Sequence, residues 1–151
     1  MIKIICVGKI KENYLKEAIE EYKKRLSKYT KLEIIEVSDI DNPSSDIVLL
    51  KEKESIERHI DSKDFVVTLE IEGNMLSSTD LAKKIDNIFN TSSTITFIIG
   101  GSFGLHQDIK NRSNYKLSFS KLTFPHQLFR VNLLEQIYRA FKINNNEAYH
   151  K

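Results

Sequence analysis

The sequence predicts an α/β fold in which a mostly parallel sheet carries helices on both faces. Short apolar runs alternate along the chain with longer segments of helical periodicity, a pattern typical of β-α-β units. Several of the apolar runs have no polar side, as expected for parallel strands that are buried on both faces. The chain has 151 residues, of which 40% are apolar and 29% are charged. This is the size of one domain with a full core, and we expect residues 1–151 to form a single domain.

Five apolar runs, each bounded by a turn or a polar loop, are predicted to be strands. The runs are Ile2–Val7, Leu32–Val37, Phe65–Leu69, Thr94–Ile99 and Tyr115–Phe119. The first run ends at Gly8, the second alternates between apolar and charged residues, and the third has the composition of a buried central strand. After the third run, Glu70–Gly73 is expected to form a turn that places two acids at the strand end.

Five segments are predicted to be helices because of their apolar spacing or a capping signal. The segments are Asn13–Leu26, Ile47–Ile60, Ser77–Phe89, Gln107–Arg112 and Pro125–Ile143. Ser45 or Asp46 is the expected cap of the second helix, which is highly charged and is expected to be peripheral. Ser77 and Asp80 form a capping-box pattern, and Pro125 suits a first helical turn.

Charge and composition limit the possible function classes. The net charge is +2, which by itself does not indicate a nucleic-acid-binding protein. The locally basic segment Tyr22–Lys31 is compatible with a solvated helix face and with a phosphate-contacting surface. Cys6 lies inside an apolar strand without a partner, which indicates a buried thiol in a reducing compartment. No run reaches membrane-spanning length and no signal cleavage site is visible, so we expect a cytoplasmic protein with no membrane association.

Two strand ends carry most of the residues that suggest chemistry. Phe97–Gly104, FIIGGSFG, opens into glycines, which allow a close approach of the main chain to a ligand. Ser118–Arg130, SFSKLTFPHQLFR, combines aromatic, hydroxyl and basic side chains that a plain connection does not need. Ligands of open α/β sheets bind beyond the carboxyl ends of the strands, so we expect the two ends to form one small-molecule site. Gly100-Gly101 alone would favour a simple turn, whereas together with Phe119–Phe124 it is equally compatible with a turn and with a ligand site.

Other ligand classes lack their motifs in this chain. The first strand is not followed by GxGxxG, and no GxxxxGK[ST] phosphate loop is present. A nucleotide-binding redox module is therefore a distant alternative. The four His residues and the single Cys are scattered, so we expect no metal site.

Three segments carry a resemblance to a known family. FIIGGSFGL, LSFSKLTFPHQLFRVNLLEQIYRA and the closing YHK resemble the ribosomal RNA large-subunit methyltransferase H family, which belongs to the SPOUT superfamily of knotted methyltransferases. The resemblance extends over nearly the whole chain. It implies a C-terminal trefoil knot, although knots are rare in proteins, a homodimer, and S-adenosyl-L-methionine as the cofactor.

The resemblance also implies a reaction and a substrate. The expected reaction is methylation of N3 of a pseudouridine in a stem-loop of 23S ribosomal RNA, with the assembled ribosome as substrate. Two alternatives are a knotted methyltransferase that acts on transfer RNA and a non-enzymatic RNA-binding dimer. The residues expected to hold the methyl donor are Leu69, Gly100, Phe119, Ser120, Lys121, Leu122, Thr123 and Phe124.

The acceptor nitrogen must lose a proton, or its anion must be stabilised by a cation. The expected catalytic residues are Arg130, His126, Tyr149 and His150.

Each catalytic candidate also has a purely structural interpretation. The apolar residues of the last helix cover an arc of about 200°, which is wide enough for a second subunit to pack on it. Arg130 falls inside this arc, so it is compatible with a salt bridge to Glu70 or Glu72 and with a contact to the target base or a phosphate. His126 is compatible with helix capping or core packing. Tyr149–Lys151 is compatible with a disordered polar end and with a base-contacting tail that completes the site of a neighbouring subunit.

Overall fold

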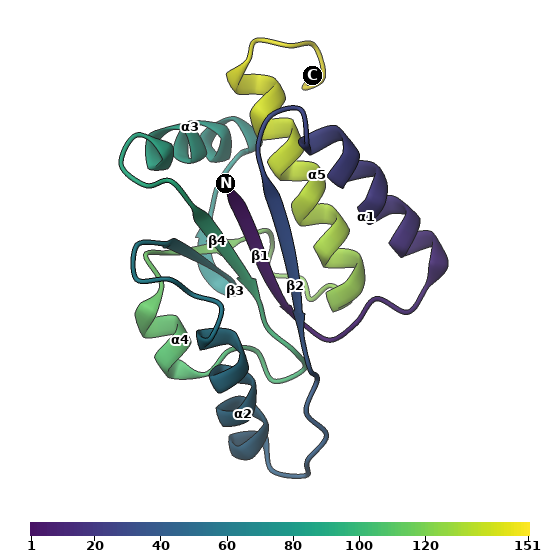
Figure 1. Cartoon of the computed structure of the whole chain (residues 1–151), viewed down its shortest axis with the longest axis vertical. Coiled ribbons are helices and arrows are strands. Elements are labelled where there is room, and N and C mark those ends of the chain that lie inside the picture. Colours follow the sequence, from purple (N-terminus) through teal and green to yellow (C-terminus); the bar gives the residue numbers. More distant parts are fainter.

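The protein folds around one five-stranded sheet in which every pair of neighbouring strands is parallel. A computed structural model describes residues 1–151 (Figure 1). The strands are β1 (Ile2–Val7), β2 (Leu32–Val37), β3 (Phe65–Met75), β4 (Ile95–Ile99) and β5 (Tyr115–Ser118). Their order across the sheet is β2-β1-β4-β3-β5. The predicted parallel sheet is therefore confirmed.

Five helices connect the strands and cover both faces of the sheet. They are α1 (Asn13–Leu26), α2 (Ser45–Glu57), α3 (Ser78–Phe89), α4 (Gln107–Arg112) and α5 (His126–Asn144). The helices α1, α3 and α5 pack on one face, with α5 between the other two, and α2 and α4 pack on the opposite face. None of the helices combines the length and the apolar character of a membrane-spanning segment.

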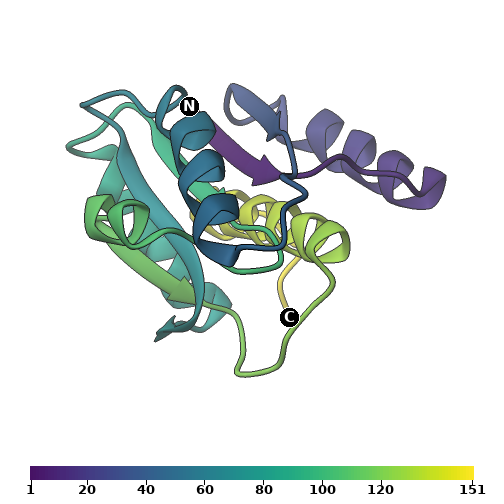
Figure 2. The same cartoon turned by 90° about the horizontal axis from the view of Figure 1, so that it is seen from below.

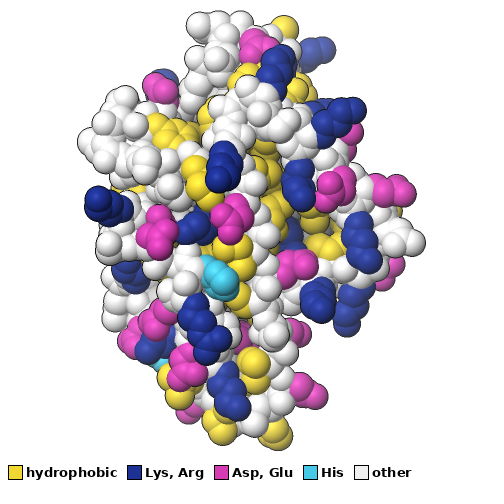
Figure 3. All heavy atoms as spheres, in the orientation of Figure 1, with side chains coloured by type: hydrophobic (Ala, Val, Ile, Leu, Met, Phe, Trp, Pro, Cys, Tyr) yellow, Lys and Arg dark blue, Asp and Glu magenta, His cyan; other side chains and the backbone are white.

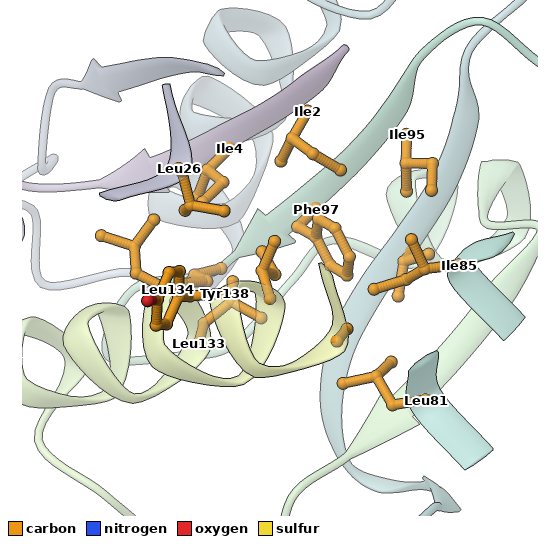
Figure 4. Close-up of a cluster of buried hydrophobic side chains, with 14 of the residues drawn as sticks. Ile2, Ile4, Leu26, Leu81, Ile85, Ile95, Phe97, Leu133, Leu134 and Tyr138 are labelled. Atoms are coloured by element: carbon orange, nitrogen blue, oxygen red, sulfur yellow. The ribbon is translucent and has the colours of Figure 1, made fainter. Parts of the chain in front are cut away.

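The alternation of side chains along β1 supplies a core on each face. Ile2, Ile4 and Cys6 belong to a cluster of 21 buried residues under α1, α3 and α5, whereas Ile5 and Val7 belong to a cluster of eight under α2 and α4. Figure 4 shows the larger cluster, where side chains of β1 and β4 meet those of α5 and α3. Burial raises the pKa of the Cys6 thiol to about 12, so this thiol stays protonated near neutral pH.

The beginning and end of α2 differ from the prediction. Its N-cap is Ser44, whose hydroxyl accepts a hydrogen bond from the main-chain N–H three residues later, rather than Ser45 or Asp46. The helix ends at Glu57 instead of Ile60. The helix therefore begins at Ser45, one residue earlier than a cap at Ser45 would allow.

The largest difference from the prediction concerns β3. This strand continues to Met75, although the sequence predicts a turn at Glu70–Gly73. Its register against β5 shifts between Leu69 and Asn74, so the expected turn is an irregularity within a strand. Gly73 lies so close to the β5 main chain that a Cβ there would be 2.8 Å from a carbonyl oxygen.

At the amino ends of the strands, buried polar side chains form a closed network. The Asp64 carboxylate accepts hydrogen bonds from Lys3 Nζ at 3.0 Å and from Thr96 Oγ1 at 2.9 Å. Lys3 also donates to the carbonyl oxygen of His59 at 2.8 Å, and Arg112 donates to the carbonyl oxygen of Asp64 at 3.1 Å. Because the buried charges have partners, the network fixes the strand ends without a ligand.

Candidate functional site

The carboxyl ends of β3, β4 and β5 lie next to one another in the sheet. Figure 2 views the molecule from this side and shows the long segment between β5 and α5 projecting from the body. A cavity of about 590 Å³ lies at these strand ends, within the size range of small-molecule sites. It is lined by the end of β3, the loop after β4, the segment after β5 and the first turn of α5.

The glycine loop Gly100–Gly104 forms one wall of the cavity. The N–H of Gly104 donates to the carbonyl oxygen of Gly101 at 3.0 Å, and Gly104 has a φ of +77°, which favours glycine. A Cβ on Gly100 would lie 2.5 Å from the Gly104 carbonyl oxygen. Gly100 is therefore required by the tightness of the loop itself, in addition to any close approach of a ligand.

Aromatic side chains from the segment after β5 form the opposite wall. The ring centroids of Phe119 and Phe129 are 4.8 Å apart, and those of Phe124 and Phe129 are 5.7 Å apart. Ser120 Oγ accepts a hydrogen bond from the N–H of Leu122 at 3.0 Å, which stabilises the turn between the aromatic residues. The segment is thereby anchored on the first turn of α5.

The two strand ends singled out in the sequence do meet around this cavity. Of the eight residues expected to hold a methyl donor, seven line it, and the exception is Lys121. The Lys121 side chain is exposed, in the same segment as the lining residues Ser120 and Leu122.

The sequence interpretation did not include the acidic part of the lining among the site residues. Glu70 and Glu72 both line the cavity. The Glu70 carboxylate accepts a hydrogen bond from Thr68 Oγ1 at 2.6 Å and lies 3.9 Å from Lys110 Nζ. Their position directly after an apolar run was the available signal, but the sequence suggested for these acids only a turn at the strand end and a salt bridge to Arg130. A cavity with apolar walls and carboxylates suits a ligand that combines a flat apolar group with positive charge.

His126 is the catalytic candidate that lines the cavity. It is the first residue of α5 and is exposed, while the N-cap position belongs to Pro125 and has no side-chain cap. The interpretations of His126 as a helix cap or a core residue are therefore wrong. Its imidazole is accessible to a molecule in the cavity.

Arg130 lies one turn further along α5 and does not line the cavity. It is 1% exposed. Its Nη1 is 2.6 Å from Glu36 Oε2, and its Nη2 donates to the carbonyl oxygen of Gly8 at 3.1 Å. The salt bridge anticipated for this residue exists, but its partner is Glu36 rather than Glu70 or Glu72. The Nε atom has no hydrogen-bond partner.

The C-terminal tail packs against α5. The Tyr149 hydroxyl donates to Glu135 Oε1 at 3.1 Å, and its ring centroid is 5.0 Å from that of Tyr138. His150 Nδ1 lies 3.0 Å from Arg139 Nη1. Burial, followed by the bond to Glu135, raises the pKa of Tyr149 to about 12. This tyrosine is consequently a hydrogen-bond donor rather than a proton acceptor near neutral pH.

A second, smaller cavity lies beside the first and is lined by α5 residues that include the partner of Tyr149. It has a volume of about 300 Å³ and is lined in part by Glu135 and Gln136. Leu117 and Phe119 line both cavities. Tyr149 is thus separated from the larger cavity by Glu135 and by the end of β5.

Three of the five basic residues in the segment Tyr22–Lys31 form ion pairs with nearby acids. Arg25 pairs with Glu21 at 3.0 Å and lies over the ring of Tyr22, and Lys28 is 3.8 Å from Glu147. On the face of the molecule shown in Figure 3, basic and acidic side chains are interspersed. The solvated-face interpretation of this segment therefore describes it better than a basic patch.

Comparisons with known proteins agree with this architecture. A family described as "Predicted SPOUT methyltransferase" matches residues 1–150. A protein from Methanococcus maripaludis is 57% identical over 157 aligned positions, which cover 99% of each chain. A protein from Clostridium botulinum, named ribosomal RNA large subunit methyltransferase H, is 54% identical with the same coverage.

Solved structures share the fold at low sequence identity. A probable methylase family protein from Haemophilus influenzae superposes with a TM-score of 0.57 at 16% identity, covering 99% of this chain and 70% of that one. A tRNA methyltransferase from Aquifex aeolicus gives a TM-score of 0.53 at 14% identity, with coverages of 91% and 69%. The full-length family match and the high identity to whole relatives decide the assignment. The chain belongs to the SPOUT methyltransferases and, within them, to the ribosomal RNA large-subunit methyltransferase H family.

Proposed function

We propose that the protein transfers a methyl group from S-adenosyl-L-methionine to N3 of a pseudouridine in 23S ribosomal RNA of the assembled ribosome. The observation that carries the proposal is the cavity between the Gly100–Gly104 loop and the Phe119–Phe124 segment. The names of the relatives support ribosomal RNA as the substrate class, and the sequence resemblance supports the pseudouridine.

The lining of the cavity fits the methyl donor. Leu69, Leu122 and the phenylalanine rings offer apolar surface for an adenine, and the tight glycine loop exposes main chain beside it. Glu70 and Glu72 provide negative charge for a ligand that carries a sulfonium and an ammonium group. When bound, the donor would supply an already activated methyl group, so the protein has mainly to place the acceptor.

The acceptor nitrogen is an imide N–H, which becomes nucleophilic when its proton leaves. Within one chain, His126 is the candidate base, because it lines the cavity while the Tyr149 hydroxyl stays protonated. Arg130 would contribute positive charge from the neighbouring turn of α5. We propose that it acts on the acceptor base rather than on the donor, because it lies outside the cavity lining.

We further propose a homodimer and a C-terminal trefoil knot. Leu122 and Leu128 are 70% and 41% exposed beside the start of α5, which is unfavourable in water and would be relieved by a second subunit. The chain leaves the sheet edge at β5 and returns past the end of β1, where Arg130 contacts Gly8. This return path supports the knot that the family resemblance implies.

The test is a methylation assay with purified ribosomes and, in parallel, with transfer RNA. The expected product is N3-methylpseudouridine, detected by mass spectrometry of nucleosides from the ribosomal RNA only. Methylated transfer RNA with unmodified ribosomes would move the protein to the transfer-RNA class. Absence of any product, together with no rise in melting temperature at saturating donor, would favour a non-enzymatic RNA-binding protein.

A further inference from the structure

A buried acid that the proposed reaction does not use lies against the glycine loop. Glu52 of α2 is 2% exposed and is not part of the cavity lining. A Cβ placed on Gly101 would be 3.3 Å from Glu52 Oε1 and 3.5 Å from Oε2. The carboxylate is thus in contact with the loop whose other surface forms the cavity wall.

One oxygen of this carboxylate is unsatisfied. Oε2 accepts a hydrogen bond from the N–H of Ile40 at 3.3 Å, whereas Oε1 has no partner. The adjacent cation, Lys53, is engaged with Asp108 at 2.8 Å. A buried acceptor without a donor is destabilising, and such atoms are rare in native proteins.

Contacts between α2 and α4 hold Glu52 against the glycine loop. The Lys53–Asp108 ion pair fastens α2 to α4, and α4 begins three residues after Gly104. The helix α2 therefore contacts the glycine loop at Gly101 and is also joined to the helix that follows this loop. Burial, and then the nearby Asp39, raise the pKa of Glu52, which agrees with a carboxyl group that lacks a cationic partner.

We propose that Glu52 is a positioning residue for the methyl donor. When the cavity fills, Glu52 Oε1 accepts a hydrogen bond from a main-chain N–H of the Gly100–Gly104 loop and holds the loop against the ligand. This bond would satisfy the one oxygen of the Glu52 carboxylate that has no partner. This inference rests on the proposed function, since it takes the loop to be a wall of the donor site.

The test compares three variants by calorimetric titration with S-adenosyl-L-methionine and by thermal melting without it. Glu52→Met removes the acceptor at similar volume, Glu52→Gln keeps an acceptor oxygen, and Glu54→Met is the control on the exposed side of the same helix. We expect Glu52→Met to melt close to the wild-type temperature, because removal of the unpaired Oε1 offsets the loss of the hydrogen bond from the Ile40 N–H to Oε2. Its affinity for the donor should nevertheless be about tenfold lower. Glu52→Gln and Glu54→Met should bind within about twofold of wild type.

A weaker donor affinity with little change in melting temperature separates positioning from a purely structural role. A structural role would lower melting temperature and affinity together or leave both unchanged, and either result would overturn the inference. Equal losses of affinity in Glu52→Met and Glu52→Gln would also overturn it, because the glutamine still offers an acceptor.

Two further results keep the inference separable from the proposed function. Wild-type protein that does not bind the donor would refute both, whereas normal wild-type binding with an unaffected Glu52→Met variant would refute the role of Glu52 alone. If Glu52→Met does not fold, amide hydrogen exchange of the wild type decides the matter. Donor binding should slow exchange within Gly101–Gly104, and unchanged exchange there would count against the inference.

Discussion

The two ends of the sheet use the same strands but treat buried polar groups in opposite ways. At the amino ends, Asp64, Lys3 and Thr96 satisfy one another in a closed network. At the carboxyl ends lie the cavity and the two buried side-chain atoms without hydrogen-bond partners, Glu52 Oε1 and Arg130 Nε. The buried charges at the amino end have partners within the chain, whereas two buried side-chain atoms at the carboxyl end have none.

This difference separates a structural role from a functional one. A buried charge with all its partners contributes to a unique fold, whereas an unsatisfied buried atom lowers stability. Proteins keep such local violations where the group has another role. Glu52 lies against the Gly100–Gly104 loop, which contains a residue that the family resemblance assigns to the donor, and Arg130 is one of the catalytic candidates. We therefore expect substitutions at the two ends of the sheet to affect different measurements.

The largest expected effect is that of Gly100→Val at the carboxyl end. Even the Cβ of the new side chain would overlap the Gly104 carbonyl oxygen, so the loop must open and the donor site is lost. We expect no detectable heat of S-adenosyl-L-methionine binding and no methylation, with the circular dichroism spectrum retained. Phe103→Val, at an exposed position of the same loop, is the matched control and should bind normally. An unchanged affinity of Gly100→Val would remove this loop from the site.

Arg130→Ala and deletion of Tyr149–Lys151 should affect catalysis more than donor binding. Both changes lie outside the lining of the larger cavity, so the donor affinity of the folded variants should stay within a few-fold of wild type. Arg130→Ala also breaks the pair with Glu36 and should lower the melting temperature. Methylation of ribosomes should fall at least about a hundredfold, as when a charge-stabilising group is removed from an active site. Arg58→Ala, which removes an exposed arginine after α2, should methylate normally. Weak donor binding in both variants would show that these residues contact the donor instead.

At the amino end, Asp64→Ala should change stability and leave the site intact. It leaves the Lys3 ammonium, whose side chain is 8% exposed, without its closest carboxylate. The free energy of unfolding in urea should fall by about 3–5 kcal/mol, the usual effect of removing one partner of a buried pair. Asp61→Ala, whose side chain is 85% exposed, should cost much less. A loss of donor affinity in folded Asp64→Ala would contradict the separation of the two ends.

The contribution of Asp64 to the free energy of unfolding should depend on pH. Burial alone would raise the pKa of Asp64, but hydrogen bonds from the Asp61 N–H, Lys3 and Thr96 lower it below 3.8. A carboxyl group with a depressed pKa stabilises the fold above its unfolded-state pKa and loses this contribution as the pH falls through the folded-state value. The difference in stability between wild type and Asp64→Ala should therefore shrink below about pH 4.

Local patterns predicted the elements of the fold well. The predicted bounds of Ile2–Val7, Asn13–Leu26, Leu32–Val37 and Gln107–Arg112 agree with the structure, because apolar spacing and capping signals act over a few residues. The continuation of β3 through Gly73 was not predictable in this way. It depends on pairing with β5, more than 40 residues away, across a register shift that leaves no local signature.

The candidate site shows the same division between local and long-range information. The sequence indicated which two strand ends carry ligand-binding residues, and these ends line one cavity. It did not predict Glu36 as the partner of Arg130, because the two lie 94 positions apart and the choice among several acids depends on the strand order. The contact of Glu52 with the glycine loop could not be predicted for the same reason. The sequence of α2 does not show which of its charged residues is buried until the packing is known.

The position of α5 has a consequence for synthesis. Leu133, Leu134 and Ile137 of this helix are fully buried in the larger core, and the segment just before it supplies a wall of the cavity. A nascent chain that has not yet emerged beyond Asn144 therefore leaves the apolar face of β1 and β4 uncovered, a condition that promotes aggregation. A prematurely terminated product would bind chaperones or be degraded by proteases. The reason is that α5 and the segment before it complete both the larger core and the wall of the cavity.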